Sequence, residues 1–350
     1  MLRPELRLAS AVEVESSLQH ASPPLIIEAA CSHSRPTRPV IPGAIILALE
    51  DIDFSAEDAP GQPSRVSGNY SLRPAAELRA ALEAAGVTCL RPTVVYTQSV
   101  KCGGLDLAVA CRLCWALSLA GVQQLTLLAG GTRAWTDAGF ELAPAPAEPT
   151  PRDFFEGSTG ALSFPMHPEY DAATSEVENA VACVAGCSQL ADVRSWREFI
   201  GGGHDYPFPL PCGRIPTSIW AHWGPSTYVA GDFYAPATGK MHPLEETAAL
   251  WRDWGLVLGE GRIVFYCGSG WRSAVAWCLA RLLGHHDCAS YDGGFLEWSM
   301  CDARAEEHPI ARGVPGQAKA AQLEGVGRDE VDGASGLSAA AHDVESPSAA

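Results

Sequence analysis

At 350 residues the chain exceeds the usual length of one domain, so two domains are the first expectation. Its composition, with 47% hydrophobic and 19% charged residues, is typical of a folded globular protein. A net charge of −17 argues against nucleic acid as the main partner, because phosphate binding needs an excess of lysine and arginine. No apolar run is long enough to span a bilayer and the first residues do not resemble a secretory signal. We therefore expect no membrane association and a cytoplasmic location, with an organelle left open.

The twelve cysteines are expected to be mostly free thiols in a reducing compartment, because no secretory signal is recognisable. Cys111 and Cys114 lie in AVACRLCWALSLAG, whose helical periodicity predicts two small core residues. No second cysteine pair or histidine cluster follows at zinc-finger spacing. We therefore expect neither a metal site nor a cofactor.

The first predicted helix begins at Ser10, which forms a capping box with Glu13. A series of landmarks then follows: LIIEAA, IPGA, the helix-like PAAELRAALEAAG, the strand-like TVVYT and finally LLAGGTRAW. A second series has the same order: LADVR, IPTS, PLEETAALWRDWG, IVFYC and SYDGGFLEW. In both series twelve positions separate the proline of the helix from its closing glycine, Pro74 to Gly86 and Pro243 to Gly255. The chain is therefore a diverged internal repeat.

This repeat predicts two tandem α/β domains, each a parallel-type sheet with helices on both faces. We place the domains at residues 8–143 and 171–312. The stretch 144–170 is rich in proline and polar residues and is predicted to be a linker. Residues 313–350 are rich in alanine, glycine and serine, are acidic, and are predicted to be a disordered tail.

Cys267 stands directly after the strand RIVFY, where ligand chemistry gathers in α/β sheets. Gly268 and Gly270 let the following loop curl, so that backbone amides form an anion-binding nest at a helix N-terminus. We expect Ser273 to be the N-cap of that helix. A thiol in this nest, beside Arg272, should lose its proton more easily and become a nucleophile. The alternative is a buried structural cysteine in a tight strand–helix turn.

The motifs CGSGWR, LADVRSW, GRIPTSIW and YDGGFLEW resemble those of tandem-domain rhodaneses over residues 10–312. That sulfurtransferase family includes thiosulfate sulfurtransferase and 3-mercaptopyruvate sulfurtransferase. The resemblance implies an inactive first domain and a second domain whose cysteine becomes a persulfide. Alignment of VVYT with VFYC places Thr97 at the position of Cys267, which agrees with an inactive first domain. Cys102, five positions further on, is interpreted as incidental.

The reaction implied by the resemblance has two steps. Cys267 attacks the outer sulfur of a small anionic donor such as thiosulfate, and a thiol or cyanide acceptor then removes that sulfur. The resemblance assigns substrate binding to the loop residues Gly268, Ser269, Gly270, Trp271, Arg272 and Ser273.

Two further residues, Asp192 and Arg194, match the family's Asp-x-Arg stretch. They are expected to order the loop or to help bind the donor, and the alternative is a surface or interdomain ion pair. Trp271 is expected either to line the substrate pocket or only to pack against neighbouring side chains.

The choice of donor depends on two loop positions. Ser269 puts no charge over the loop and favours mercaptopyruvate, whereas Arg272 favours the doubly charged thiosulfate ion. A hydrogen bond to a charged group is worth about 1.5–3 kcal/mol against ~1 for a neutral one, so we predict thiosulfate as the better donor. In the alternative, Arg272 forms an ion pair with a carboxylate such as Asp192, and the opening above the loop (the loop mouth) carries no free charge.

Other readings of the loop remain open. Phosphatases of the rhodanese-like type and arsenate reductases use a similar loop with one residue more between cysteine and arginine than the four residues found here. A non-catalytic binding module of the same fold is a further alternative, against which the intact loop around Cys267 argues.

Overall fold

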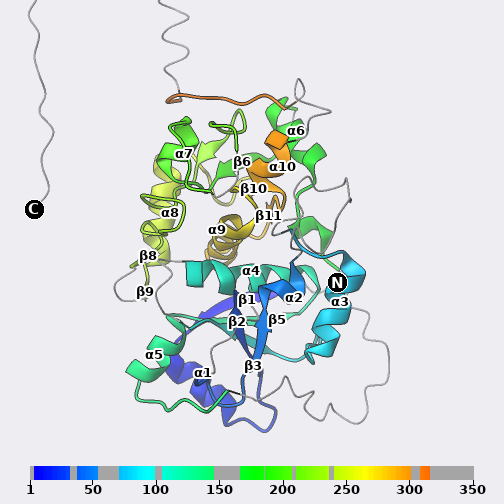
Figure 1. Cartoon of the computed structure of the whole chain (residues 1–350), viewed down its shortest axis with the longest axis vertical. Coiled ribbons are helices and arrows are strands. Elements are labelled where there is room, and N and C mark those ends of the chain that lie inside the picture. Colours follow the sequence, from blue (N-terminus) through cyan, green and yellow to red (C-terminus); the bar gives the residue numbers. More distant parts are fainter. Residues whose placement is uncertain are drawn as a thin grey trace, which may run out of the picture. The chain divides into compact units, whose positions relative to one another are not determined.

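Two parallel β-sheets, one in each half of the chain, form the framework of the protein (Figure 1). The computed structural model describes residues 4–31, 38–53, 71–98, 105–145, 166–184, 186–206, 210–235, 240–300 and 308–315. Residues up to Arg312 belong to one unit. Within it, the described residues up to 145 are called the first half, and those from 166 to 312 the second half.

The first half holds a five-stranded parallel sheet with the strand order β1-β5-β4-β2-β3. Strand β4 is buried along its whole length, as expected of a central strand with helices on both faces. The elements, in chain order, are β1 (Glu5–Ala9), α1 (Ala11–Leu18), β2 (Leu25–Ala30), β3 (Ile45–Ala48), α2 (Leu49–Ile52), α3 (Ala75–Ala84), β4 (Thr93–Tyr96), α4 (Leu105–Leu119), β5 (Gln124–Leu128) and α5 (Gly131–Asp137).

The second half holds a four-stranded parallel sheet with the order β11-β10-β6-β7, and a small antiparallel pair, β8-β9. Its elements are the 3₁₀ helix η1 (Pro168–Tyr170), α6 (Thr174–Val181), β6 (Gln189–Asp192), α7 (Trp196–Ile200), β7 (Ile219–Trp220), β8 (Tyr234–Ala235), β9 (Lys240–Met241), α8 (Leu244–Asp253), β10 (Ile263–Tyr266), α9 (Trp271–Leu282), β11 (Cys288–Ser290) and α10 (Gly294–Met300).

The two sheets share one topology, because β5-β4-β2-β3 corresponds strand by strand to β11-β10-β6-β7. The same hydrogen bond also recurs in each half. The backbone N–H of Ile41 donates to the Tyr96 hydroxyl at 3.1 Å, and that of Ile215 donates to the Tyr266 hydroxyl at 3.2 Å. Both isoleucines belong to the Ile-Pro landmarks of the repeat. The predicted fold, two tandem α/β domains with helix-flanked parallel sheets, is confirmed.

Helices α4 and α9 pack against each other between the two sheets (Figure 1). The central part of α4 is buried on all sides, because one face meets its own sheet and the other meets the second half. Cys111 and Cys114 are 1% and 0% exposed there, in agreement with the core role expected from the sequence. This helix pair therefore joins the two halves through an apolar interface.

Several sequence predictions concern the ends and connections of the chain. The capping box is present: Ser10 donates its backbone N–H to Glu13 at 2.7 Å, and its hydroxyl accepts from the Glu13 N–H at 3.4 Å. Most of the predicted linker, residues 146–165, and the tail from residue 316 onward lie outside the described residues. Among the helices of the described segments, none combines the length and the apolar character needed to cross a bilayer.

Candidate active site

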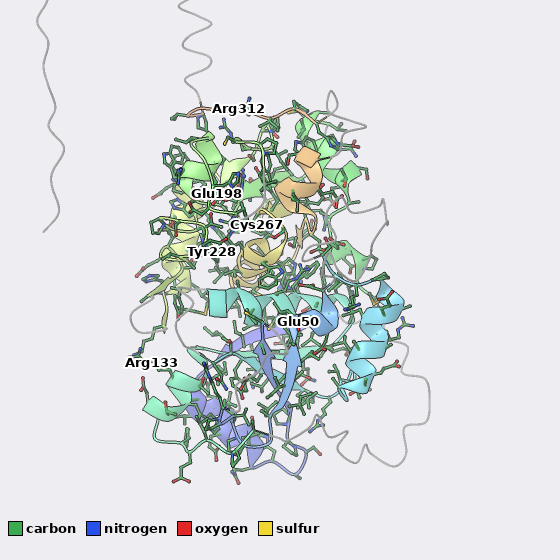
Figure 2. The ribbon with its side chains drawn as sticks, viewed as in Figure 1. Glu50, Arg133, Glu198, Tyr228, Cys267 and Arg312 are labelled. Carbon is green, nitrogen blue, oxygen red and sulfur yellow. The ribbon has the colours of Figure 1, made fainter. Side chains whose placement is uncertain are left out.

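Cys267 lies at the carboxyl end of β10 and is 2% exposed. Figure 2 shows it with Glu198 in the second half of the chain. The loop that follows Cys267 leads directly into α9, which begins at Trp271 and is capped by Gly270 in a left-handed conformation with φ +84°. The cysteine therefore sits beside the positive end of a helix of twelve residues.

The start of α10 holds the loop from one side. The carbonyl of Cys267 accepts the N–H of Phe295 at 2.7 Å, and that of Gly268 accepts the N–H of Leu296 at 2.9 Å. A trans peptide directs its C=O and N–H to opposite sides, so the amides that follow these two carbonyls point away from α10. Gly294, with φ +56°, permits this packing, because a Cβ there would lie 2.7 Å from both carbonyl oxygens. The second glycine of YDGGFLEW thus allows the close packing of α10 against the loop backbone.

Ser273 does not cap α9 as predicted from the sequence. It lies within the first turn, is fully buried, and the cap position belongs to Gly270. Its hydroxyl contacts the Gly270 carbonyl at 3.0 Å, the Ser290 hydroxyl at 2.8 Å and the Cys267 Sγ at 3.9 Å. The hydroxyl therefore faces the cysteine instead of the helix amides.

Arg272 is 3% exposed and forms a two-pronged ion pair with Glu198, with both Nη–Oε distances at 2.9 Å. Burial alone would lower the pKa of Arg272, but the Glu198 carboxylate outweighs this effect and raises it. Burial likewise opposes ionisation of Glu198, yet Arg272 lowers the pKa of that carboxyl to about 2. The expected free guanidinium over the loop is therefore absent from the described site. Arg272 pairs with a carboxylate, and its partner is Glu198, not Asp192.

Tyr206 covers the loop and was not singled out from the sequence. Its hydroxyl accepts a hydrogen bond from Arg272, and its ring lies where a Cβ on Gly268 would be. Burial is the main cause that raises the pKa of the Tyr206 hydroxyl, with a smaller contribution from the nearby Cys267 sulfur. A protonated phenol therefore lies close to the cysteine. Nothing in the sequence between β6 and β7 indicated this, because the contact joins residues far apart in the chain.

Asp192 and Arg194 form a buried ion pair behind the loop, with the Arg194 Nη2 at 2.6 Å and Nε at 2.9 Å from the carboxylate. The Tyr266 hydroxyl donates to the same carboxylate at 2.7 Å, and Arg194 also reaches the Gly213 carbonyl at 2.8 Å. The pair lies within the second half, so the reading as a surface or interdomain pair is wrong. This arrangement ties β6, β10 and the Ile-Pro turn together, which fits a role in ordering the loop.

The first half also reaches the loop. The half-buried Trp271 donates its indole N–H to a carboxylate oxygen of Asp53 at 3.1 Å. In the corresponding place of the first half, Thr97 follows β4 and offers no thiol. Cys102 lies outside the described residues. Within the parts of the chain that the structure describes, no group of three or more potential ligands could hold a metal ion.

Comparison with known proteins places this site in a family. The family model described as a rhodanese-like domain matches residues 176–301, which include the Cys267 loop. The thiosulfate sulfurtransferase YnjE of Escherichia coli (strain K12) is 32% identical over 214 residues. That alignment covers 61% of this chain but only 46% of YnjE, so the matched sequence spans less than half of this relative. SseB of Mycobacterium tuberculosis (strain ATCC 25618 / H37Rv) is 27% identical over 313 residues, 88% of this chain and 97% of its own length.

Solved structures give the same answer for the fold. The crystal structure of YnjE has a TM-score of 0.69 at 25% identity and covers 89% of this chain and 70% of that chain. The anaerobic ergothioneine biosynthesis enzyme from Chlorobium limicola, in complex with trimethyl histidine, has a TM-score of 0.71 at 27% identity, with 88% and 71% covered. A persulfide form of the enzyme EanB with ergothioneine is equally similar, with a TM-score of 0.71 at 26% identity, and 88% of this chain and 71% of that one covered. The second half of the chain therefore carries a rhodanese-like domain, and the fold of the described residues resembles those of YnjE and EanB.

Proposed function

We propose that this chain takes sulfane sulfur from thiosulfate onto Cys267 and passes it to a thiol or to cyanide. The observation that carries the proposal is the setting of Cys267, at the carboxyl end of β10, beside the N-terminus of α9 and within contact of the Ser273 hydroxyl. The proposed donor takes its support from YnjE, which is named a thiosulfate sulfurtransferase.

The proposed reaction balances without an external oxidant. The Cys267 thiolate attacks the outer sulfur of thiosulfate, a new S–S bond forms, and the old S–S bond breaks with its electron pair leaving on sulfite. The acceptor thiolate or cyanide then attacks the outer sulfur of the persulfide and releases the Cys267 thiolate. The backbone amides of Gly268 and Ser269 and the Ser273 hydroxyl would stabilise the anionic sulfur in both steps. No separate metal or redox group takes part in this scheme.

Mercaptopyruvate is the second candidate donor, and one observation favours it. The ion pair of Arg272 with Glu198 removes the free positive charge that the argument for thiosulfate assumed. Asp192 and Arg194 are also paired, so neither of these two ion pairs leaves a net positive charge for the donor. A doubly charged donor would then depend on backbone amides and hydroxyl groups.

The nucleophile is tested by weighing the intact protein after incubation with thiosulfate, with and without a reductant. We expect the wild type to gain the mass of one sulfur atom and Cys267→Ser to gain none, because only the thiolate is lost from a nearly isosteric side chain. The same variant should also fail to convert thiosulfate and cyanide to thiocyanate. Sulfur uptake by Cys267→Ser at the wild-type level would assign the chemistry to another residue.

The donor is tested by comparing kcat/KM for thiosulfate and mercaptopyruvate in the wild type and in the double variant Arg272→Met with Glu198→Leu. Removal of both partners avoids leaving one buried charge alone. We expect the variant to lower both values by the same factor, because the pair supports the loop. A loss of about tenfold or more for thiosulfate alone would mean that Arg272 leaves Glu198 to bind that donor.

Besides a thiol and cyanide, trimethyl histidine should be tried as a third sulfur acceptor, since it is the natural substrate of the Chlorobium limicola enzyme.

A further inference from the structure

Arg112 of the first half is fully buried and lies between two carboxylates from different halves of the chain. It contacts Asp292 through Nη1 at 2.5 Å, and Asp53 through Nη2 at 2.8 Å and through Nε at 3.2 Å. Asp53 is 3% and Asp292 1% exposed. These three side chains are called the Arg112 cluster below. Buried charges of this kind require partners with good geometry, and each carboxylate here has one.

Two members of the cluster touch the loop that carries Cys267. A Cβ on Gly270 would lie 2.6 Å from the Asp292 carboxylate and 2.9 Å from the Arg112 guanidinium, so the loop backbone rests directly on both groups. The next residue, Trp271, donates its indole N–H to Asp53 at 3.1 Å. The cluster therefore supports the two residues at which the loop becomes helix α9.

The second half supplies only one of the cluster's three charges. Asp292 belongs to the second half, but its carboxylate is held from the first half, by Arg112 and by the Leu72 backbone N–H at 2.8 Å. The first half thus fixes a residue of the second half that the loop rests on. Such support of the loop does not require a nucleophile in the first half.

We propose that Arg112 and Asp53 are positioning residues of the second-half active site, and that the first half acts on the reaction by holding Gly270 and Trp271 through the Arg112 cluster. The proposal rests on the proposed function of Cys267. Positioning affects rate steeply, because a displacement of about 1 Å at a reacting group can cost about a hundredfold.

The test uses full-length Arg112→Met, Arg112→Lys and Asp53→Leu, with Arg262→Met as the matched control. Arg262 also joins two carboxylates, Glu176 at 2.6 Å and Asp287 at 3.2 Å, but it precedes β10 at the end of the sheet opposite to Cys267. The measured quantities are the melting temperature, kcat and KM for thiosulfate, and the rate at which iodoacetamide alkylates Cys267, followed by peptide mass spectrometry.

We expect Arg112→Met and Asp53→Leu to lower kcat by about tenfold to a hundredfold and to change the alkylation rate of Cys267. Arg112→Lys should restore part of kcat, because it keeps the charge but not the fork of donors. Arg262→Met should lower the melting temperature without these changes. The proposal would be overturned if Arg112→Met and Arg262→Met lost the same amount of kcat for each degree of melting temperature that they lose.

Two further results keep the test decisive. If Arg112→Met does not fold, Trp271→Phe removes the indole N–H to Asp53 while keeping an aromatic ring at this position, and an unchanged kcat and alkylation rate in that variant would contradict the proposal. If the wild type takes no sulfur from any donor, the proposed function fails, but the alkylation rate of Cys267 needs no donor. Positioning by the Arg112 cluster is then still decided by the comparison with Arg262→Met.

Discussion

Glu198 connects two helices of the second half through one carboxylate. At the third position of α7 it completes a capping box, accepting the Ser195 backbone N–H at 3.1 Å and hydroxyl at 2.8 Å. The same carboxylate holds both Nη atoms of Arg272 in α9. Because Arg272 follows the Cys267 loop directly, Glu198 links α7 to the end of that loop.

Glu198→Gln should therefore destabilise the protein in a pH-dependent manner. The pKa of Glu198 is lowered from 4.5 to about 2, so its ionised form stabilises the fold fully above pH 4.5, and this contribution is lost as the pH falls through 2. A shift of this size corresponds to about 3 kcal/mol, within the range for breaking a buried ion pair. Urea unfolding should show this gap between wild type and variant at pH 7, and it should close as the pH approaches 2.

Glu13→Gln is the control for the capping box alone, since Glu13 forms the same box with Ser10 at an exposed helix start. Its effect should be smaller than that of Glu198→Gln. A gap for Glu198→Gln that stayed constant from pH 7 to pH 2 would show that the ion pair with Arg272 does not stabilise the fold.

At the scale of elements, the junction of β10, loop and α9 depends on a left-handed residue at Gly270, with φ +84°. Gly284 at the other end of α9 has nearly the same conformation, φ +83°, but no atom lies within 4 Å of the place of its Cβ. The two positions therefore separate the cost of the backbone conformation from the cost of steric overlap.

Gly284→Ala should cost about 1–2 kcal/mol, the price of a left-handed conformation with a Cβ, and should leave sulfur transfer unchanged. Gly270→Ala should cost more, about 3 kcal/mol or above, because its Cβ overlaps Asp292 and Arg112 as well. It should also reduce persulfide formation, since the loop must shift. Thermal unfolding and intact mass after thiosulfate measure both effects, and similar values for the two variants would refute the steric argument.

The fold could be predicted from the sequence because its determinants are local. The spacing from Pro243 to Gly255 reflects one helix, and Tyr96 and Tyr266 mark the ends of equivalent strands. The place of Cys267 between a strand and a helix could be predicted for the same reason, since strand, loop and helix are contiguous in the chain. Ser273 was wrongly predicted as the N-cap, because a left-handed Gly270 caps the helix three residues earlier.

The surroundings of the cysteine could not be predicted, because they depend on contacts between distant segments. Glu198 lies 74 residues from Arg272, and Arg112 lies 180 residues from Asp292. A single sequence shows that a buried arginine needs a carboxylate but does not show which one is within reach. The charge of the loop mouth, and with it the preferred donor, was for this reason the least predictable property of the site.

At the scale of the whole molecule, the contact between α4 and α9 joins the two halves through side chains that include three buried thiols. Cys278 of α9 directs its S–H to the Cys111 carbonyl of α4 at 3.6 Å, and Cys114 lies beside them. Burial raises the pKa of Cys278 well above its ordinary value. These thiols are therefore protected from alkylation as long as the interface stays closed.

Two other buried thiols can report the unfolding of each half separately: Cys89 lies in the first half and Cys288 in the second. Burial raises the pKa of Cys288 to about 12. The apolar interface and the Arg112 cluster couple the halves, so we expect them to unfold together. Pulses of iodoacetamide at increasing urea, followed by peptide mass spectrometry, should show Cys89, Cys278 and Cys288 losing protection at one urea concentration. The exposed Cys31 and Cys183 should react without urea and calibrate the pulse.

Arg112→Met should change this pattern in a defined way. Loss of the bridge between Asp53 and Asp292 weakens the link between the halves more than either half's own sheet, since neither carboxylate belongs to a strand. The variant should therefore expose Cys278 at a lower urea concentration than Cys288. If Cys89 and Cys288 already lose protection at different concentrations in the wild type, the halves fold independently. The first half would then support the active site by contact alone, without sharing the stability of the second.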